Sequence, residues 1–411
     1  MARIFPFQPY RYSDIAGPLA DLLTQPYDKI SPAMRARYLE ASPFNLVRII
    51  LGPALEKDDE SDNVYTRAHM HLEDWVGSGV LARESEPGLF PYYQEFTVPD
   101  TGERLVRKGF IALGAVEEYS AGVVHRHEQT LSGPKKDRLE LLRHTRAHFG
   151  QIFMLYPDPS QSVDALLEEA AREAPIASVA DEYGARHLLW KISDPDRVSE
   201  IQGLMEDKKL IIADGHHRYE TALAFHKENP KMPGADRVMM TFVNMHSPGL
   251  TILATHRLLS GLPGFQPESF LGRAARTFGV EPLNSVEELR KAWAEAGDGS
   301  RIGVAMGESL FLLHREHTGG RLDVTLLHED LIDGVLGISQ EAVREEKHVR
   351  YIRGLEPAIE EVRSGEADIG FLLKPTSIED VARISFGGGV MPQKSTDFYP
   401  KLLSGLTIYK Y

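Results

Sequence analysis

The sequence predicts a mixed α/β (α+β) fold. Between residues 187 and 245, short apolar runs of strand length alternate with segments of helical periodicity. Hydrophobic content is 42% and charged content 26%, both ordinary for a globular protein. A chain of 411 residues can bury a large core without disulfides. At roughly 150 residues per domain, this length favours two to three domains.

The first region, residues 1–150, is expected to be an N-terminal α+β region that contributes to the functional site. Its elements follow from three patterns. Acidic residues indicate a loop over 54–62, and helical periodicity indicates a helix over 65–76. Two alternating segments around a Pro-Asp-Thr-Gly turn indicate the strands of a hairpin, over 89–98 and 104–117.

The second region, residues 151–260, carries the β-α-β-α-β pattern of an α/β or α+β unit. Asp194 is expected to cap a helix that starts with Pro195. Other helices are expected over 163–173 and 217–228, and strands over 187–192, 209–213 and 237–245.

The third region, residues 261–411, repeats this style as a C-terminal α/β region. It ends in a glycine-rich turn and a polar segment, at 387–389 and 391–401. Helices are expected over 285–297, 325–336, 355–364 and 377–383, and strands over 301–314 and 367–373.

Charge and cysteine content exclude several functional classes. Lys plus Arg number 46 and Asp plus Glu 60, a net charge of −14, which disfavours nonspecific binding of nucleic acid. There is no Cys, so disulfides and a Cys nucleophile are impossible. No apolar run reaches the roughly 18 residues of a membrane span, and the N-terminus lacks a secretory apolar core. We expect a cytoplasmic protein that contacts neither membrane nor nucleic acid.

The densest chemistry lies where the strand over 209–213 meets the helix over 217–228. Asp214-Gly215-His216-His217-Arg218 places a glycine and three potential donors at a helix start, where backbone N–H groups lack internal partners. Helix starts normally favour acidic residues, so this composition points to a bound anion. Two alternatives are a helix that shows these side chains to solvent, and a metal site formed by Asp214, His216 and His217.

A second polar cluster spans residues 125–138. Glu128 is a candidate general base or Mg²⁺ ligand, and Lys135, Lys136 and Arg138 are candidates for holding phosphate oxygens. The alternative is a solvated loop that precedes a helix over 137–148, with Asp137 in the first turn.

Two further segments are candidates. Asp28 lies in Gln25-Pro-Tyr-Asp28, before a helix capped by Ser31 and started by Pro32, and is either a catalytic acid or a turn residue. Lys394, Ser395 and Thr396 follow a glycine-rich turn and could hold phosphate. They lack the glycine spacing of a Walker loop, and a plain turn is the alternative.

Gly215-His-His-Arg-Tyr-Glu220 resembles the Gly-Cys-His-Arg-Tyr-Glu signature of sulfiredoxin and the phosphate-binding Gly-x-x-Arg segment of ParB-type proteins. The version in free serine kinases of this superfamily is close to Asp-Gly-His-His-Arg. The resemblance implies that Gly215, His216, His217 and Arg218 hold the phosphates of ATP, ADP or another nucleotide. His216 stands where sulfiredoxin has its reactive Cys, so the reductase chemistry does not carry over.

The whole chain resembles the bacterial and archaeal family known as domain of unknown function 1015. The matching stretches are Gln25-Pro-Tyr-Asp28, His127-Glu-Gln-Thr130, Pro134-Lys-Lys-Asp-Arg138, Ala213-Asp-Gly-His-His-Arg218, Thr255-His-Arg257, Met391-Pro-Gln-Lys-Ser-Thr396 and Pro400-Lys401. Together the two resemblances imply a ParB/sulfiredoxin-like nucleotide-binding core with large insertions and added α/β segments.

The function expected first is a nucleotide-dependent phosphotransferase that acts on a small hydroxyl metabolite. Free L-serine is the first substrate to test, as the resemblance to the serine kinases implies. Mg²⁺ would bridge phosphate oxygens and a carboxylate, Asp214 or Glu128, while Glu128, Asp28 or Asp214 serves as the catalytic acid or base. The alternatives are a metal-dependent hydrolase of phosphate compounds, such as a nucleotidase or phosphatase, and a non-enzymatic nucleotide-binding switch. The oligomeric state is left open.

Overall fold

The computed structural model describes residues 2–128, 133–295, 297 and 299–411. The chain forms two compact units. Unit 1 comprises residues 1–98, 103–251 and 400–411, and unit 2 comprises residues 99–102 and 252–399. Most of the regions 1–150 and 151–260 of the sequence therefore share one unit, to which the end of the chain also returns, whereas residues 99–102 and 252–260 belong to the other.

Unit 1 is built on a nine-stranded mixed sheet. Its strands lie in the order β6 (Val124–Arg126), β11 (Leu210–Asp214), β8 (Ile152–Tyr156), β12 (Arg237–Asn244), β5 (Arg104–Ala115), β4 (Phe90–Thr97), β10 (Arg186–Leu189) and β9 (Ala177–Ala180), with β1 (Ile4–Phe5) also on β5. β11 is parallel to β6, and β8 is parallel to β12. The other pairs in this sheet are antiparallel.

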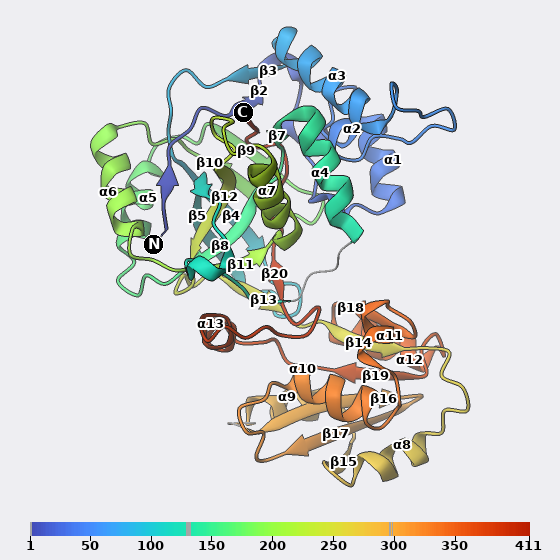
Figure 1. Ribbon diagram of the computed structural model, residues 1–411. Coiled ribbons are helices and arrows are strands. Elements are labelled where there is room, and N and C mark those ends of the chain that lie inside the picture. Colours follow the sequence, from blue (N-terminus) through green and yellow to red (C-terminus); the bar gives the residue numbers. More distant parts are fainter. Residues whose placement is uncertain (1, 129–132, 296, 298) are drawn as a thin grey trace. The chain divides into compact units, whose positions relative to one another are not determined.

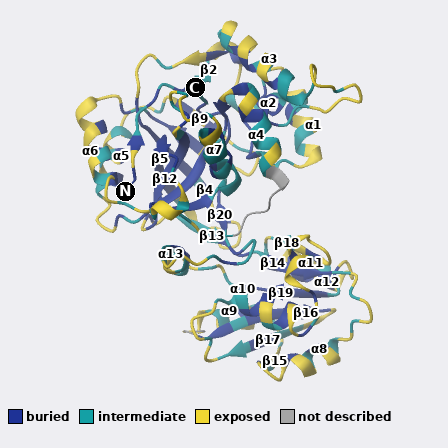
Figure 2. Cartoon of the chain, viewed as in Figure 1, coloured by how far each residue is buried: buried dark blue, intermediate teal, exposed yellow. Residues whose placement is uncertain are grey.

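Helices cover both faces of this sheet (Figure 1). α5 (Ser162–Ala170) and α6 (Pro195–Met205) contact each other on one side. On the other side, α7 (His216–Glu228) contacts α4 (Gly133–Thr145), which in turn contacts α3 (Val64–Gly77). α2 (Val47–Ile50) and α1 (Pro32–Ala41) continue this row. Figure 2 shows that the strands are buried, whereas α3 and α6 expose their outer faces.

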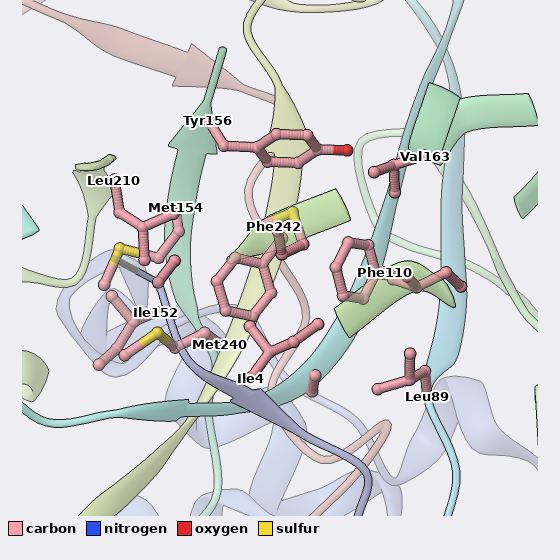
Figure 3. Packing of buried hydrophobic residues seen from close by; sticks show 14 of the residues in the cluster. Ile4, Leu89, Phe110, Ile152, Met154, Tyr156, Val163, Leu210, Met240 and Phe242 are labelled. Carbon is pink, nitrogen blue, oxygen red and sulfur yellow. The ribbon is translucent and has the colours of Figure 1, made fainter. Parts of the chain in front are cut away.

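The main core of unit 1 joins the sheet to the helices α5 and α6 and to Tyr219 and Ala222 of α7. Ile152, Met154, Met240 and Phe242 alternate with residues of the opposite face along β8 and β12, as a sheet covered on both sides requires. Phe242 stacks on Phe110 of β5 with ring centroids 5.2 Å apart (Figure 3).

Short strands bind the chain ends to unit 1. β2 (Tyr10–Tyr12) pairs with β3 (Leu81–Arg83), and β21 (Tyr409–Lys410) pairs with β7 (Ala147–His148). The second pair, together with stacking of Tyr411 on Phe225 of α7, holds the last residues against the face that carries α7.

Unit 2 is built on a six-stranded antiparallel sheet. Its order is β15 (Gly279–Leu283), β17 (Ser309–Arg315), β16 (Ser300–Met306), β19 (Ile369–Leu372), β14 (His256–Leu259) and β18 (Val349–Ile352). The described helices are α8 (Pro267–Ala274), α9 (Val286–Ala294), α10 (Asp323–Leu326) with a π-helical turn over Leu327–Asp333, α11 (Gln340–Arg344), α12 (Leu355–Arg363) and α13 (Ile378–Phe386). β13 (Thr251–Leu253) pairs with β20 (Asp397–Tyr399).

Strand alternation produces two cores in unit 2. Ile302 and Val304 of β16 pack with Leu327 and Leu331 of the π-helical turn. Ala305 faces the opposite way and packs with Leu289 of α9 and with residues of α12. One strand therefore supplies both layers.

The mixed α/β class predicted from the sequence is confirmed. The Asp194 and Ser31 caps also form, since each side chain accepts the backbone N–H of the third residue of its helix. Several boundaries differ by a few residues, such as the end of α5 at Ala170 rather than 173, and two differences need an explanation. α4 begins at Gly133 rather than near Asp137, because a proline fits within the first turn of a helix. The helix expected over 325–336 is a short α10 followed by π-helical backbone. Among the described residues, no helix has both the length and the apolar character to cross a membrane.

Candidate functional site

The site is centred on the junction between β11 and α7. Asp214 ends the strand, Gly215 turns the chain with φ of +90°, and α7 starts at His216. This backbone conformation strongly favours glycine. A Cβ on Gly215 would also lie 3.0 Å from the guanidinium of Arg218. The tight turn therefore lets the side chain of Arg218 fold back over the first turn of its own helix.

Asp214 is surrounded by cationic groups. Its Oδ2 atom lies 3.7 Å from Arg218 Nη2 and 3.7 Å from Lys401 Nζ, and its Oδ1 accepts the N–H of Gly215 at 2.9 Å. Burial alone would raise the pKa of Asp214, but Lys401, Arg218 and Lys29 hold that pKa well below its usual range. Asp214 is therefore ionised, and one carboxylate faces several positive charges.

Arg107 adds a further cation and positions the C-terminal segment. It is 1% exposed on β5, where its guanidinium donates to Gln94 Oε1 and to the carbonyl oxygen of Pro400. Gln94 in turn donates to the carbonyl of Lys401 at 2.8 Å. Burial lowers the pKa of Arg107 to about 10, so it stays charged at neutral pH. Two residues of the sheet, Arg107 and Gln94, thereby fix the carbonyl groups of Pro400 and Lys401.

Two histidines pack at the start of α7. The rings of His127 and His216 have centroids 4.9 Å apart. His127 Nδ1 lies 2.6 Å from the carbonyl oxygen of Ile212, to which it donates, and His127 Nε2 lies 3.8 Å from Glu128 Oε2. Burial lowers the pKa of His127 to about 4 and holds the pKa of His216 well below its ordinary value. Both rings are neutral at pH 7, so the positive charge of the site comes from its Arg and Lys side chains.

Several buried polar atoms at this junction have no hydrogen-bond partner within the described part of the chain. They are His216 Nε2, His217 Nδ1, Thr221 Oγ1 and both amide atoms of the fully buried Gln151. Arg218 donates to the backbone carbonyl of Gln151. Gln151 therefore lies beside the start of α7, Gly215 to Arg218, which is called the cradle below. Buried polar atoms are nearly always satisfied in folded proteins. Their concentration here favours a bound ligand or ordered water.

The segment that contains Asp28 reaches the same junction. Tyr27–Lys29 forms a short 3-10 turn. Lys29 acts electrostatically on Asp214. Burial lowers the pKa of His217, whereas the negative charges of Glu220 and Asp28 act to raise it. Asp28 is therefore close to the start of α7.

The basic residues of 125–138 have unequal roles. Lys135 pairs with Glu220 of α7. Arg138 pairs with the neighbouring Asp137 and lies over the ring of Tyr27, 4.3 Å from its centroid. Lys136 is exposed. Residues 129–132, which follow Glu128, lie outside the described part of the chain.

Lys394, Ser395 and Thr396 belong to unit 2, whereas Gly215 to Arg218 belong to unit 1. Arg257 donates to the carbonyl oxygen of Lys394 at 2.8 Å, and Ser395 Oγ donates to the carbonyl of Pro392. Thr376 donates to the carbonyl of Ser395 at 2.8 Å. These contacts fold the segment against unit 2.

Lys29, Arg107 and Gln151 are site residues that were not predicted from the sequence, whereas Lys401 appeared there only in the matching stretch Pro400-Lys401. Arg107 lies in a strand that also carries Arg104 and Lys108, so the sequence does not distinguish it from the exposed charges of that strand. The other three lie in segments whose sequences do not indicate where they fold.

No group of three or more His, Asp or Glu side chains in the described residues is arranged to hold a metal ion. The metal site of Asp214, His216 and His217 considered above is therefore not formed. Mg²⁺ bound with a nucleotide needs only one or two carboxylates, because phosphate and water oxygens complete its shell. Asp214 and Glu128 each have a carboxylate that could serve as such a ligand.

Comparisons with known proteins place these observations in context. A family model described as "Protein of unknown function (DUF1015)" matches residues 4–328. No curated protein matches the sequence.

Solved structures give weak matches. A conserved hypothetical protein from Pyrococcus furiosus has 16% identity and a TM-score of 0.36, and the match covers 69% of this chain and 91% of the other. A free serine kinase in complex with AMP has 17% identity and a TM-score of 0.37, covering 69% and 89%. SbnI with a C-terminal truncation, from Staphylococcus aureus, has 11% identity and a TM-score of 0.37, covering 72% and 87%. Likeness at this level does not identify an activity, which must come from the site itself.

Proposed function

The chain belongs to the DUF1015 family, and on this premise we propose that it is a nucleotide-dependent phosphotransferase acting on a small hydroxyl metabolite. ATP or ADP is the proposed phosphate donor, with its phosphates at the start of α7. The observation that carries the proposal is the excess of positive charge around Asp214.

The charge balance supports an anionic ligand. Arg218 and Lys401 flank one carboxylate oxygen, and Lys29 and Arg107 act on the same group. With Asp28 and Glu128 counted beside Asp214, four cations against three carboxylates leave a surplus of one positive charge, within a chain whose net charge is −14. Polyphosphate would neutralise this surplus and accept hydrogen bonds from the free N–H groups of the helix start.

The proposed roles follow from position. The backbone N–H groups of His216 and His217 bind phosphate oxygens, and Arg218 and Lys401 neutralise their charge. Glu128 accepts the proton of the acceptor hydroxyl, and the hydroxyl oxygen attacks the terminal phosphorus of the nucleotide. The bond from this phosphorus to the bridging oxygen breaks, and the shortened nucleotide leaves with that oxygen. His127, fixed through Nδ1 by the carbonyl of Ile212, lies beside Glu128, with Nε2 3.8 Å from Glu128 Oε2. Asp28 is the alternative base, since it approaches the same helix start.

Mg²⁺ is part of the proposal. Glu128 or Asp214 would contribute a carboxylate oxygen, and the ion would supply charge neutralisation to the phosphates. Asp214 is already shared by Arg218 and Lys401, so Glu128 is the better candidate ligand if Asp28 is the base.

The test separates transfer from hydrolysis. Purified protein is incubated with ATP or ADP and Mg²⁺, with and without free L-serine and other small hydroxyl compounds. Nucleotide consumption that depends on the acceptor, with a phosphorylated product detected by mass spectrometry, supports the phosphotransferase. Phosphate release without acceptor would instead identify a phosphohydrolase. Nucleotide binding by thermal shift, without turnover under any condition, would identify a binding switch.

A further inference from the structure

Unit 2 contains its own large cavity, formed entirely by residues of that unit. Its volume is about 700 Å³. It lies at the end of the antiparallel sheet where β19 finishes and β14 begins, since Leu373 and Thr255 both line it. Cavities that hold small metabolites measure roughly 300–1,000 Å³, so this one has the size of a ligand site.

The lining of this cavity carries more positive than negative side chains. The cations are Arg257, Arg321, Lys374 and Arg383, and the carboxylates are Asp323 and Asp380. This excess stands out in a chain with a net charge of −14. Because a cavity wall has a low dielectric, uncompensated charge there acts on a ligand more strongly than charge on an open surface.

Internal ion pairs account for only part of this positive charge. Arg383 Nη2 lies 2.6 Å from Asp380 Oδ1, and Arg321 Nη1 lies 3.4 Å from both Glu329 and Asp330. The ammonium of Lys374 makes no hydrogen bond or close ion pair with any residue that the structure describes, and the carboxylate of Asp323 in the same cavity acts on it electrostatically. Lys374 projects from the loop between β19 and α13, a segment that lines the cavity from Lys374 to Ser377.

We propose that this cavity binds a small polyanionic metabolite through phosphate or carboxylate groups, with Lys374 as its principal contact. Arg321 at the rim adds a guanidinium that is 42% exposed and able to turn toward an anion. A single phosphate would occupy only a small part of the cavity, so the ligand is of metabolite size with two or more acidic groups. The residues that line this site belong to unit 2, and the proposal does not depend on the function proposed for unit 1.

The test uses the full chain with Arg218→Ala, which weakens the cradle in unit 1. Pyrophosphate and citrate, titrated by calorimetry at constant ionic strength, distinguish phosphate from carboxylate chemistry. At least one is expected to bind. Adding Lys374→Glu should weaken that binding at least about tenfold, the loss of one charge-assisted contact. The charge-matched control is Lys291→Glu, which alters an exposed lysine of α9 and should change the affinity less than about twofold.

A second measurement locates the ligand. Lys374 should react with an amine-acylating reagent, and the bound anion should protect it while Lys291 remains reactive. Failure of both anions to bind, equal effects of the two glutamate variants, or binding without protection of Lys374 would each overturn the proposal.

Discussion

The ammonium nitrogen of Lys401, near the end of the chain, lies 3.7 Å from the same carboxylate oxygen of Asp214 that Arg218 approaches to 3.7 Å. Two buried hydrogen bonds hold Lys401 in place. Gln94 donates to the carbonyl of Lys401, and Arg107 donates to the carbonyl of the preceding Pro400. The C-terminal segment is therefore part of the phosphate cradle proposed above.

Replacing Lys401 with Ala should weaken ATP or ADP binding about tenfold, because one charge-assisted contact to phosphate contributes about 1.5–3 kcal/mol. Isothermal titration calorimetry measures the change. Lys410→Ala is the matched control, since its ammonium pairs with Glu73 at 3.0 Å instead. Equal losses in the two variants would show that the effect is general and would remove Lys401 from the site.

Arg218→Ala should also weaken nucleotide binding by about tenfold or more. The variant additionally loses the hydrogen bond to the backbone carbonyl of Gln151, so we expect a modest decrease in stability, about 1 kcal/mol. Arg218→Lys keeps the charge but loses the planar fork of the guanidinium, and should recover binding only in part. Unchanged nucleotide affinity in the Ala variant would contradict the cradle assignment.

Glu128→Gln should abolish turnover and leave nucleotide binding largely intact, because the amide cannot accept the hydroxyl proton. Initial rates, measured with an acceptor that the wild-type protein phosphorylates, test the loss of turnover. Nucleotide titration tests whether binding is retained. The same measurements on Asp28→Asn serve as the comparison. Full activity in the Glu128 variant, with loss in the Asp28 variant, would move the base to Asp28.

Gly215→Ala should weaken nucleotide binding more than it affects folding. An alanine at φ of +90° is strained by about 1–3 kcal/mol, and its Cβ would lie 3.0 Å from the Arg218 guanidinium. Gly203→Ala, within α6, has no atom within 4 Å of the added Cβ and should be neutral or stabilising. Thermal unfolding and nucleotide titration of both variants check this prediction, which wild-type affinity in Gly215→Ala would refute.

Acidification should destabilise unit 2 through His328. Burial lowers the pKa of His328 from 6.5 to about 3. Between those pH values the unfolded chain binds a proton that the folded chain does not, so stability falls as the pH drops from 6.5 toward 3. The slope is at most about 1.4 kcal/mol per pH unit for one group.

His328→Leu removes this titration and should reduce the pH dependence of unfolding, while other buried histidines such as His127 and His256 still contribute to it. Scanning calorimetry at pH 7, 6 and 5 measures it. His317→Leu, for which the structure indicates no comparable burial, is the control. An unchanged pH dependence in His328→Leu would show that this imidazole is protonated in the folded chain.

Much of the secondary structure was predictable because its signals are local. Helix caps at Ser31 and Asp194, the hairpin of β4 and β5, and the strand-to-helix junction at Asp214 depend on residues within a few positions of each other. The π-helical turn after α10 was not predictable, because tertiary packing of Leu327 and Leu331 accompanies it without a distinct sequence signal.

The sequence by itself determined the class of the fold, the position of the helix start that is proposed to bind an anion, and the exclusion of cysteine chemistry, since each depends on residue types at fixed spacing. Only the tertiary structure decided which distant charges reach Asp214. Lys29, Arg107 and Lys401 come from separate segments, and burial makes the two histidines beside them neutral. The physical reason is that electrostatic energy and pKa depend on distance in space and on desolvation, and neither quantity is encoded in local sequence pattern.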